Sequence, residues 1–298
     1  MESPILSQTD GAKHLADCVR NGTLFAAGKL GTSELEALCF YMTHRNSPMK
    51  MQYPSRIMKN MTVNAGLFPA TEEALDAWSN HMLKKVLPAI DIVVEWSMLK
   101  QENQILTMAN PESTRIRLRS LEPYYESQIQ DRWTAALPSS AIVALISPFP
   151  KTIKAQWERR TEVWPIHTIW PTDVTVVPIQ CGYAPTLTNE PQTSWPQDIL
   201  TKGWVAAVVS IVQQAKSAKA THAVIGCGAL SLPIAAALKQ QGITAIHTGG
   251  ATQILFGIKG RRWDTHAIIS TLYNDAWVYP HTDEIPPNAN KVENGCYW

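Results

Sequence analysis

Cysteine is scarce in this sequence, and none of its five cysteines has a second one at CxxC spacing. An odd number at irregular spacing predicts neither a disulfide framework nor a zinc cluster, and it favours a reducing compartment. The eight histidines form no HxxxH or HExxH pair, and no GxSxG motif occurs. The sequence therefore indicates no zinc site and no serine nucleophile.

An excess of charge of one sign is also lacking, as are long apolar runs. Lys and Arg number 26 against 25 Asp and Glu, so the net charge of +1 gives no general attraction to nucleic acid or to an anionic membrane. Any anion site must be local. The longest apolar runs, such as residues 204–212, are far below the roughly 20 residues of a membrane span. The first residues lack a basic stretch followed by an apolar one, so we expect no secretory signal and a cytoplasmic protein.

The composition that is present is typical of a folded protein. The 298 residues are 45% hydrophobic and 17% charged, enough to bury a large core. A near-continuous apolar run at 140–150 predicts a strand buried on both faces. Residues 71–90 begin with a threonine cap and predict a helix. Its apolar face consists of Leu75, Trp78, Met82 and Val86.

Strand and helix patterns alternate along the chain. Two strand patterns, 222–226 and 243–248, flank a helical segment, while residues 109–125 resemble a return segment before a mid-chain junction. This alternation predicts an α/β fold with Rossmann-like parallel sheets flanked by helices. We expect two closely packed halves, an N-terminal α/β half at 1–136 and a nucleotide-binding half at 137–298.

The first candidate site is the glycine turn Gly226–Cys227–Gly228, which leads from a strand into a helix. Such a turn exposes N–H groups at the positive end of the helix dipole and suits a phosphate. A dinucleotide fingerprint is not complete, because Ser231 stands at the third glycine position and the next strand ends at His247 without an acidic ribose ligand. This weakens an NAD or S-adenosylmethionine interpretation. The alternative is that the glycines only allow close packing of helix and strand.

A second glycine pair follows the next strand and precedes a basic segment. Charge-assisted donors there suit a diphosphate leaving group, and a glutamine in the apolar run needs a polar partner. The alternative is a solvated basic loop. The candidate residues are Gly249, Gly250, Gln253, Lys259, Arg261 and Arg262.

The N-terminal half offers two carboxylates after a strand-to-helix turn, Glu34 and Glu36. They are candidates for ligating a divalent cation or for deprotonating an acceptor hydroxyl. The alternative is helix capping, with Thr32 or Ser33 as the N-cap.

Tryptophan, present eleven times, can stack on the apolar face of a sugar ring, although core packing is the alternative for most of these residues. Trp96, Trp195 and Trp263 lie nearest to candidate loops. Residues 182–197 form a long Pro- and Thr-rich stretch that is expected to be a loop, either a cover for a site or a plain connector.

Eight stretches spread over nearly the whole chain carry a resemblance to a known family: GKLGTSELEAL, NAGLFP, LEPYY, SPFPKTIKAQWERR, GCGALSLPIAAALK, GGATQILFGIKGRRWD, WVYP and VENGCYW. With them the chain resembles a largely uncharacterised bacterial and viral family associated with GT-D fold glycosyltransferases. In GT-D enzymes the first strand ends in a Gly-Asp-Gly-Glu-like motif associated with a nucleotide-sugar and a divalent metal. Gly31 and Glu34 match it, Thr32 stands at the aspartate position, and Ser33 completes the stretch.

This resemblance favours a role in the site for Glu34, both in catalysis and as a metal ligand. Glu34 is the acidic residue of the family motif that this sequence keeps. The resemblance implies a glycosyltransferase that moves a hexose from a nucleoside diphosphate sugar, with Mn²⁺ or Mg²⁺ as a possible cofactor, to a carbohydrate or glycoconjugate acceptor in polysaccharide biosynthesis. The glycine turns would then hold the diphosphate. The alternatives are another nucleotide-cofactor enzyme, such as a methyltransferase or oxidoreductase, and a carbohydrate-binding or assembly protein without catalysis.

Overall fold

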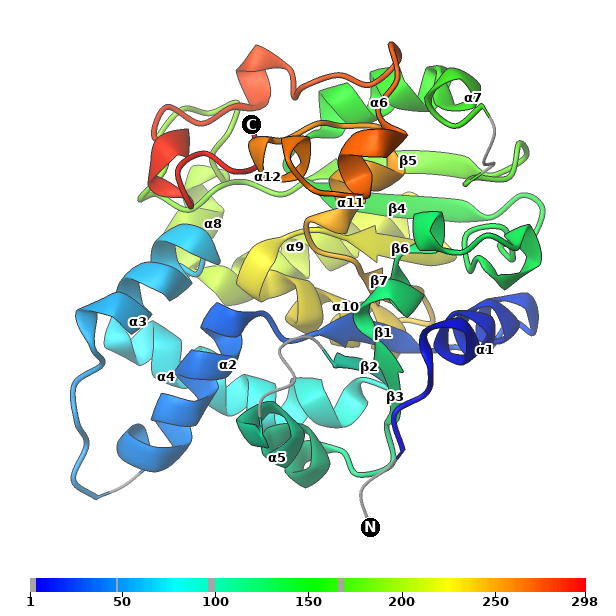
Figure 1. The fold of residues 1–298 in the computed structure, drawn as a ribbon. Coiled ribbons are helices and arrows are strands. Elements are labelled where there is room, and N and C mark those ends of the chain that lie inside the picture. Colours follow the sequence, from blue (N-terminus) through cyan, green and yellow to red (C-terminus); the bar gives the residue numbers. More distant parts are fainter. Residues whose placement is uncertain (1–3, 47, 96–99, 166–168) are drawn as a thin grey trace.

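The fold is built on one all-parallel sheet, seen in a computed structural model that describes residues 4–46, 48–95, 100–165 and 169–298 (Figure 1). Its seven strands within the described ranges lie in the order β3-β2-β1-β7-β6-β4-β5. The strands are β1 (Ala26–Lys29), β2 (Ile92–Glu95), β3 (Thr114–Arg117), β4 (Ile142–Ser147), β5 (Thr175–Gln180), β6 (His222–Ile225) and β7 (Thr244–His247). The predicted α/β class with a parallel sheet flanked by helices is confirmed.

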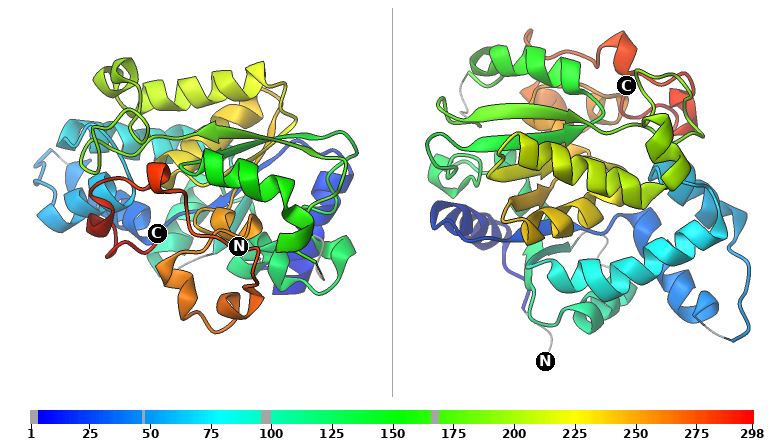
Figure 2. Two further views of the ribbon diagram at one scale, coloured as in Figure 1. Left: turned by 90° about the horizontal axis from the view of Figure 1, so that it is seen from above. Right: turned by 180° about the vertical axis from the view of Figure 1, so that it is seen from behind.

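Helices cover both faces of this sheet (Figure 2). They are α1 (Gln8–Arg20), α2 (Thr32–Phe40), α3 (Ser55–Lys59), α4 (Glu72–His81), α5 (Lys100–Ala109), α6 (Pro150–Glu158), α7 (Arg160–Val163), α8 (Gln197–Lys202), α9 (Trp204–Ser217), α10 (Ser231–Gln240), α11 (Ala251–Leu255) and α12 (Arg261–Asp264). Short π-helical turns extend α2, α3 and α4 at their C-terminal ends.

Strand β4 shows why the sheet needs helices on both faces. Its Val143 and Leu145 belong to a core shared with α1 and α6, whereas Ala144 and Ile146 belong to a core shared with α4, α9 and α10. Successive side chains of a strand point to opposite faces of the sheet, so a strand without polar residues must be buried on both faces. All four side chains are fully buried, as the apolar run predicts.

Helix α4 forms as its sequence predicts. The Thr71 hydroxyl accepts a hydrogen bond from the Ala74 N–H at 3.2 Å, which satisfies one of the free donors of the first turn. The predicted apolar face from Leu75 to Val86 is buried throughout. Trp78 also donates its indole N–H to the carbonyl of Ala229 at 3.0 Å, so α4 supports the turn after β6.

The two predicted halves meet in the middle of the sheet, where β1 pairs with β7 in parallel register. From this pair the chain continues outward to β2 on one side, and β6 lies on the other. Such a reversal of strand order opens a crevice at the carboxyl ends of the strands, which is where α/β proteins bind ligands. One continuous sheet joins the halves, and the predicted division at residue 136 stays a prediction.

The interpretation of residues 109–125 as a mere return segment missed β3. This edge strand pairs with β2 and places Arg115 and Ile116 inside. Arginines at alternate positions obscure the apolar pattern by which a strand is recognised, because their long aliphatic stems can be buried while the sequence reads as charged.

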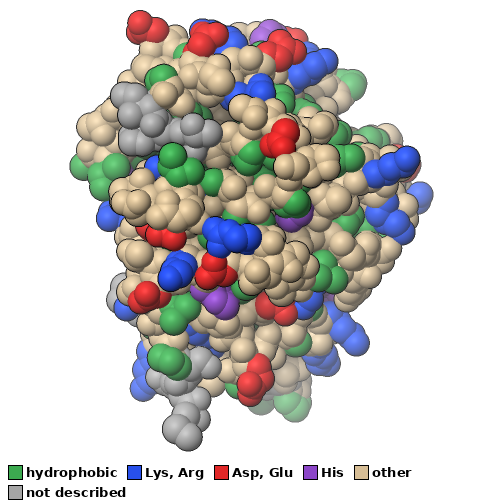
Figure 3. All heavy atoms as spheres, turned by 90° about the vertical axis from the view of Figure 1, so that its right-hand side faces the viewer, with side chains coloured by type: hydrophobic (Ala, Val, Ile, Leu, Met, Phe, Trp, Pro, Cys, Tyr) green, Lys and Arg blue, Asp and Glu red, His purple; other side chains and the backbone are tan. Residues whose placement is uncertain are grey.

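The surface shows charges of both signs side by side on the face drawn in Figure 3. This agrees with the near-zero net charge and with the prediction that no single-sign field surrounds the protein. In the part of the chain that the structure describes, no helix is both long and apolar enough to cross a membrane.

Candidate functional site

A cavity of about 710 Å³ opens at the carboxyl ends of the central strands. The last residues of three strands line it, Lys29 of β1, Ser147 of β4 and His247 of β7, together with residues that directly follow β5 and β6. The backbone path thus brings side chains from both halves of the chain to one place. A cavity at the reversal of strand order is the expected ligand site of this class of fold.

Glu34 lines this cavity from the first turn of α2. The helix begins at the N-cap residue Gly31 without a side-chain cap, so the alternative prediction of Thr32 or Ser33 as the N-cap is wrong. Gly31, Thr32 and Ser33 line the cavity as well. The Glu34 carboxylate folds back so closely that a side chain at Gly31 would collide with it.

The environment of Glu34 favours its protonated form. Burial raises the pKa of the Glu34 carboxyl, and the nearby carboxylate of Glu293 raises it further, while its own backbone N–H and the Lys29 ammonium act in the opposite direction. A carboxyl with a raised pKa in a cavity is suited to accept a proton from a substrate hydroxyl.

Glu36, the second predicted catalytic acid, does not line the cavity. Its carboxylate accepts hydrogen bonds from the Arg56 guanidinium, one of them at 2.8 Å, in an ion pair at the surface. Two residues along a helix point about 200° apart around the axis, so Glu34 and Glu36 cannot share one face. The fold separates the two acids that the sequence places together.

The first glycine turn lines the cavity with Gly226, Cys227 and Gly228. Gly228 has φ +49°, and a Cβ there would collide with the carbonyl oxygen of Ala65, which accepts a hydrogen bond from Ala229 N–H at 2.8 Å. Close packing by itself therefore requires this glycine.

Internal bonds also engage the backbone of this turn. The Cys227 N–H donates to the Ser231 hydroxyl at 2.9 Å. A Cβ at Gly226 would lie 2.7 Å from Thr252 Oγ1 and 2.9 Å from the carbonyl oxygen of Gly249, so the two glycine turns pack against each other. A diphosphate role for the first turn stays a prediction, and the packing alternative accounts for its glycines.

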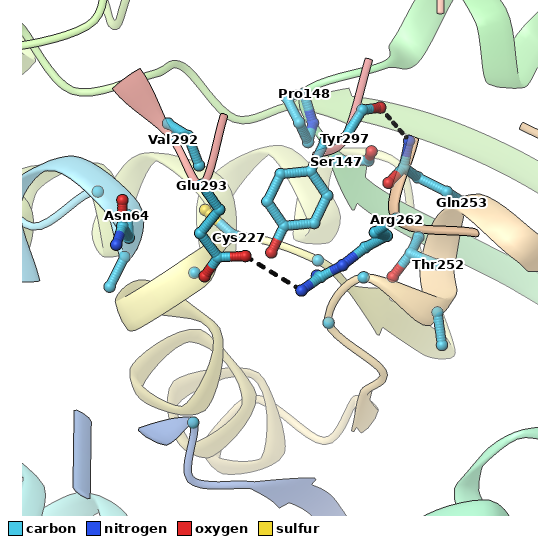
Figure 4. A pocket seen from close by; sticks show the side chains of 18 of the residues that line it. Asn64, Ser147, Pro148, Cys227, Thr252, Gln253, Arg262, Val292, Glu293 and Tyr297 are labelled. Atoms are coloured by element: carbon cyan, nitrogen blue, oxygen red, sulfur yellow. Dashed lines mark hydrogen bonds and ion pairs between the residues drawn. The ribbon is translucent and has the colours of Figure 1, made fainter. Parts of the chain in front are cut away.

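The second glycine turn, Gly249–Gly250, lines the same cavity, and so does Gln253 of α11. The amide of Gln253 donates to the backbone carbonyl of Tyr297 at 2.9 Å, the partner that a glutamine in an apolar run requires (Figure 4). Its Oε1 is buried without a hydrogen-bond partner among the described residues.

The three basic residues after this turn separate in space. Arg262 lines the cavity, whereas Lys259 and Arg261 do not. The Lys259 ammonium lies over the rings of Tyr273 and Tyr279, at 5.2 and 5.9 Å from their centroids. Of the predicted phosphate-binding cations, only Arg262 is placed to meet a ligand in the cavity.

Four charged groups of the cavity were not predicted as site residues: Lys29, Arg119, Glu122 and Glu293. Burial raises the pKa of Glu122 to about 7. Three of these residues occur in stretches that carry the family resemblance, Lys29 in GKLGTSELEAL, Glu122 in LEPYY and Glu293 in VENGCYW. The family resemblance was therefore the signal that could have pointed to these residues. That their side chains line one cavity is shown only by the fold.

The predicted loop at 182–197 contributes Gly182, Tyr183 and Trp195 to the cavity wall. Trp195 is almost fully buried and thus serves packing. Trp263 is partly buried and also lines the cavity, with the Arg262 guanidinium over its ring. Trp96, the third of them, lies outside the described residues.

His247, at the end of β7, lines the cavity. Its titration tests whether the imidazole is buried away from water. Its Nδ1 lies 3.1 Å from the Ile225 carbonyl oxygen, and burial lowers its pKa to about 4. The unfolded chain takes up this proton below about pH 6.5. The free energy of unfolding should therefore fall as the pH drops from about 6.5 to about 4, by about 3 kcal/mol from this group.

The measurement is urea unfolding of wild type and His247→Asn across that pH range, because asparagine keeps a donor for Ile225 but does not titrate. Other groups titrate in both proteins and cancel in the difference. We expect the advantage of the wild type to shrink towards pH 4. A difference that stays constant with pH would contradict a neutral buried imidazole.

No group of three or more His, Cys, Asp or Glu side chains that could hold a metal occurs within the described ranges. The carboxylates of Glu34 and Glu293 lie among the cations Lys29 and Arg262, so a Mg²⁺ or Mn²⁺ ion there would need most of its oxygen ligands from substrate phosphates and water. Comparison with protein-family models, with curated proteins and with solved structures returned no match.

Proposed function

We propose that this protein is a glycosyltransferase that moves a hexose from a nucleoside diphosphate sugar to a carbohydrate or glycoconjugate acceptor. The observation that carries the proposal is Glu34, a carboxylate at the carboxyl end of β1, in one cavity with the cations Lys29 and Arg262. Sugar transfer needs a base for the acceptor and positive charge for the leaving diphosphate, and this cavity holds both.

The proposed step is a displacement at the anomeric carbon of the donor. The acceptor oxygen forms a bond to that carbon while the bond from it to the diphosphate oxygen breaks, and the bonding pair leaves with the nucleoside diphosphate. Glu34 takes the proton of the acceptor hydroxyl. Arg262 stabilises the charge that develops on the leaving group. The second glycine turn leaves room for the diphosphate because it carries no side chains.

The size of the cavity agrees with this proposal. A volume of about 710 Å³ lies within the range of roughly 300 to 1,000 Å³ that small-molecule sites occupy. The cytoplasm, where nucleotide-sugars are made, is the proposed location, and surface-polysaccharide synthesis is the proposed setting.

The test is a thermal-shift panel of UDP-, GDP-, CMP- and dTDP-sugars. S-adenosylmethionine and NAD are included to test the alternative functions, a methyltransferase and an oxidoreductase. We expect one nucleoside diphosphate sugar to raise Tm by several degrees, since a ligand at 100 times its Kd adds about 2.7 kcal/mol. The matching nucleoside monophosphate serves as the control and should raise it less. Stabilisation by S-adenosylmethionine or NAD alone, or by no compound, would count against sugar transfer.

A further inference from the structure

Two cations that are far apart in sequence converge on the second glycine turn. A Cβ at Gly249 would lie 3.4 Å from Lys29 Cε and 3.9 Å from Lys29 Nζ, and a Cβ at Gly250 would lie 3.4 Å from Arg262 Nη1. The dipeptide is thus flanked by an ammonium from β1 and a guanidinium from α12. Each glycine of the turn thus has one positively charged side chain beside the position that a Cβ would take.

Arg262 is held in a defined orientation. Its guanidinium lies over the rings of Tyr297 and Trp263, at 4.8 and 5.2 Å from their centroids. Its Nη2 donates to Glu293 Oε2 at 3.1 Å (Figure 4). A carboxylate and a phosphate present similar oxygens to arginine, so Glu293 occupies the arginine face that a phosphate would use.

The ion pair between Glu293 and Arg262 is one that a ligand can break. Its side chains are 46% and 33% exposed, and an ion pair so open to water contributes little to stability. The segment that carries Glu293 has three consecutive residues in the left-handed region, with φ 44° at Glu293, 58° at Asn294 and 77° at Gly295. Non-glycine residues adopt this conformation at a cost, and such strain is concentrated at functional sites.

The charges at the turn suit a diphosphate. The diphosphate bridge of a nucleotide-sugar carries two negative charges, and Lys29 and Arg262 bring two positive charges to this turn, in a cavity that also holds the carboxylates of Glu34, Glu122 and Glu293. Within the described ranges, no group of three or more His, Cys, Asp or Glu side chains that could hold a metal occurs. Lys29 and Arg262 can supply positive charge to the leaving group without a metal.

We propose that Lys29 and Arg262 form a diphosphate subsite over Gly249–Gly250 that works without a divalent metal, and that Glu293 holds Arg262 until a diphosphate displaces it. The identification of the diphosphate as part of a sugar donor rests on the proposed function. The subsite itself is a binding property and can be tested without any transfer reaction.

The test is calorimetric titration of the full chain with inorganic pyrophosphate in EDTA. We expect binding in EDTA, weakened about 10-fold or more in Lys29→Met and in Arg262→Met, because a charge-assisted hydrogen bond contributes about 1.5 to 3 kcal/mol. Arg261→Met, at the neighbouring position outside the cavity, is the matched control and should bind like wild type. Glu293→Gln should bind pyrophosphate several-fold more tightly, since the resident carboxylate no longer competes.

Gly250→Ala keeps the test decisive if a charge variant folds poorly. Gly250 has φ −61°, which any residue adopts, and its Cβ would meet its neighbours at ordinary contact distance. The added methyl group would lie 3.4 Å from Arg262 Nη1 and occupy space that the proposed diphosphate needs, so we expect an unchanged Tm without ligand and a loss of pyrophosphate binding.

Two results would overturn the subsite: pyrophosphate binding that appears only when Mn²⁺ or Mg²⁺ is added, or binding in EDTA that Lys29→Met, Arg262→Met and Gly250→Ala all leave intact. Failure of the proposed function has a different signature. In that case pyrophosphate binds in EDTA and the variants lose it, which supports the subsite, while no nucleoside diphosphate sugar raises Tm.

Discussion

Glu34→Gln is expected to lower the rate of sugar transfer about 10²- to 10⁴-fold, the usual contribution of a positioned general base. Glutamine has nearly the same shape as glutamate, but it cannot take up the proton of the acceptor hydroxyl. Because burial raises the pKa of Glu34, the buried negative charge does not stabilise the fold, and the variant should melt no lower than wild type. The measurement is the release of nucleoside diphosphate in the presence of acceptor.

The matched control is Glu36→Gln. This acid lies two residues further along α2, outside the cavity and paired with Arg56 at the surface. Its replacement removes the same charge from the same helix but leaves the cavity unchanged, so we expect normal turnover. Equal losses in the two variants would mean that the charge of the helix matters and that Glu34 is not the base.

The pH dependence separates the base role from a binding role. In wild type, kcat/KM should fall as the pH drops through the pKa of Glu34, which lies above the ordinary carboxyl value, because only the carboxylate accepts the proton. The residual activity of Glu34→Gln should lack this acidic limb. An acidic limb that persists in the variant would assign the titration to another group, such as Glu122.

Gly228→Ala is expected to lower the free energy of unfolding by about 3 kcal/mol or more. An alanine at φ +49° costs about 1 to 2 kcal/mol in backbone conformation. Its Cβ would also collide with the Ala65 carbonyl oxygen and break the 2.8 Å hydrogen bond from Ala229, which adds about 1 to 3 kcal/mol. Urea unfolding measures the change.

Gly242→Ala is the control for the backbone term. Gly242 has φ +78°, but a Cβ there would have no atom within 4 Å. We expect this variant to lose only about 1 kcal/mol. If the two variants were equally stable, the packing of the first glycine turn against Ala65 would not be the reason for its glycine.

The sequence by itself determined the local elements and the class of the fold. The apolar run at 140–150 became a strand buried on both faces, and the cap and apolar face of residues 71–90 became α4 with its extension. These features can be recognised in the sequence because burial imposes a period of 2 on strands and of 3.6 on helices. Both periods appear among residues that are close together in the sequence. Glu34 and the second glycine pair were named as candidates from the turns that follow strands, Glu34 also from the family resemblance, and both line the cavity.

The tertiary structure decided which of these residues meet. The pairing of β1 with β7 places Lys29 beside Gly249, and the return of the last residues to the sheet places Glu293 on Arg262. The same fold turns Glu36 and Lys259 away from the cavity. Strand order depends on the packing of all layers at once, whereas a sequence pattern reports only the burial of its own segment. For this reason Glu34, the second glycine turn and Arg262 could be singled out as candidates from the sequence, and the approach of Lys29 to that turn could not.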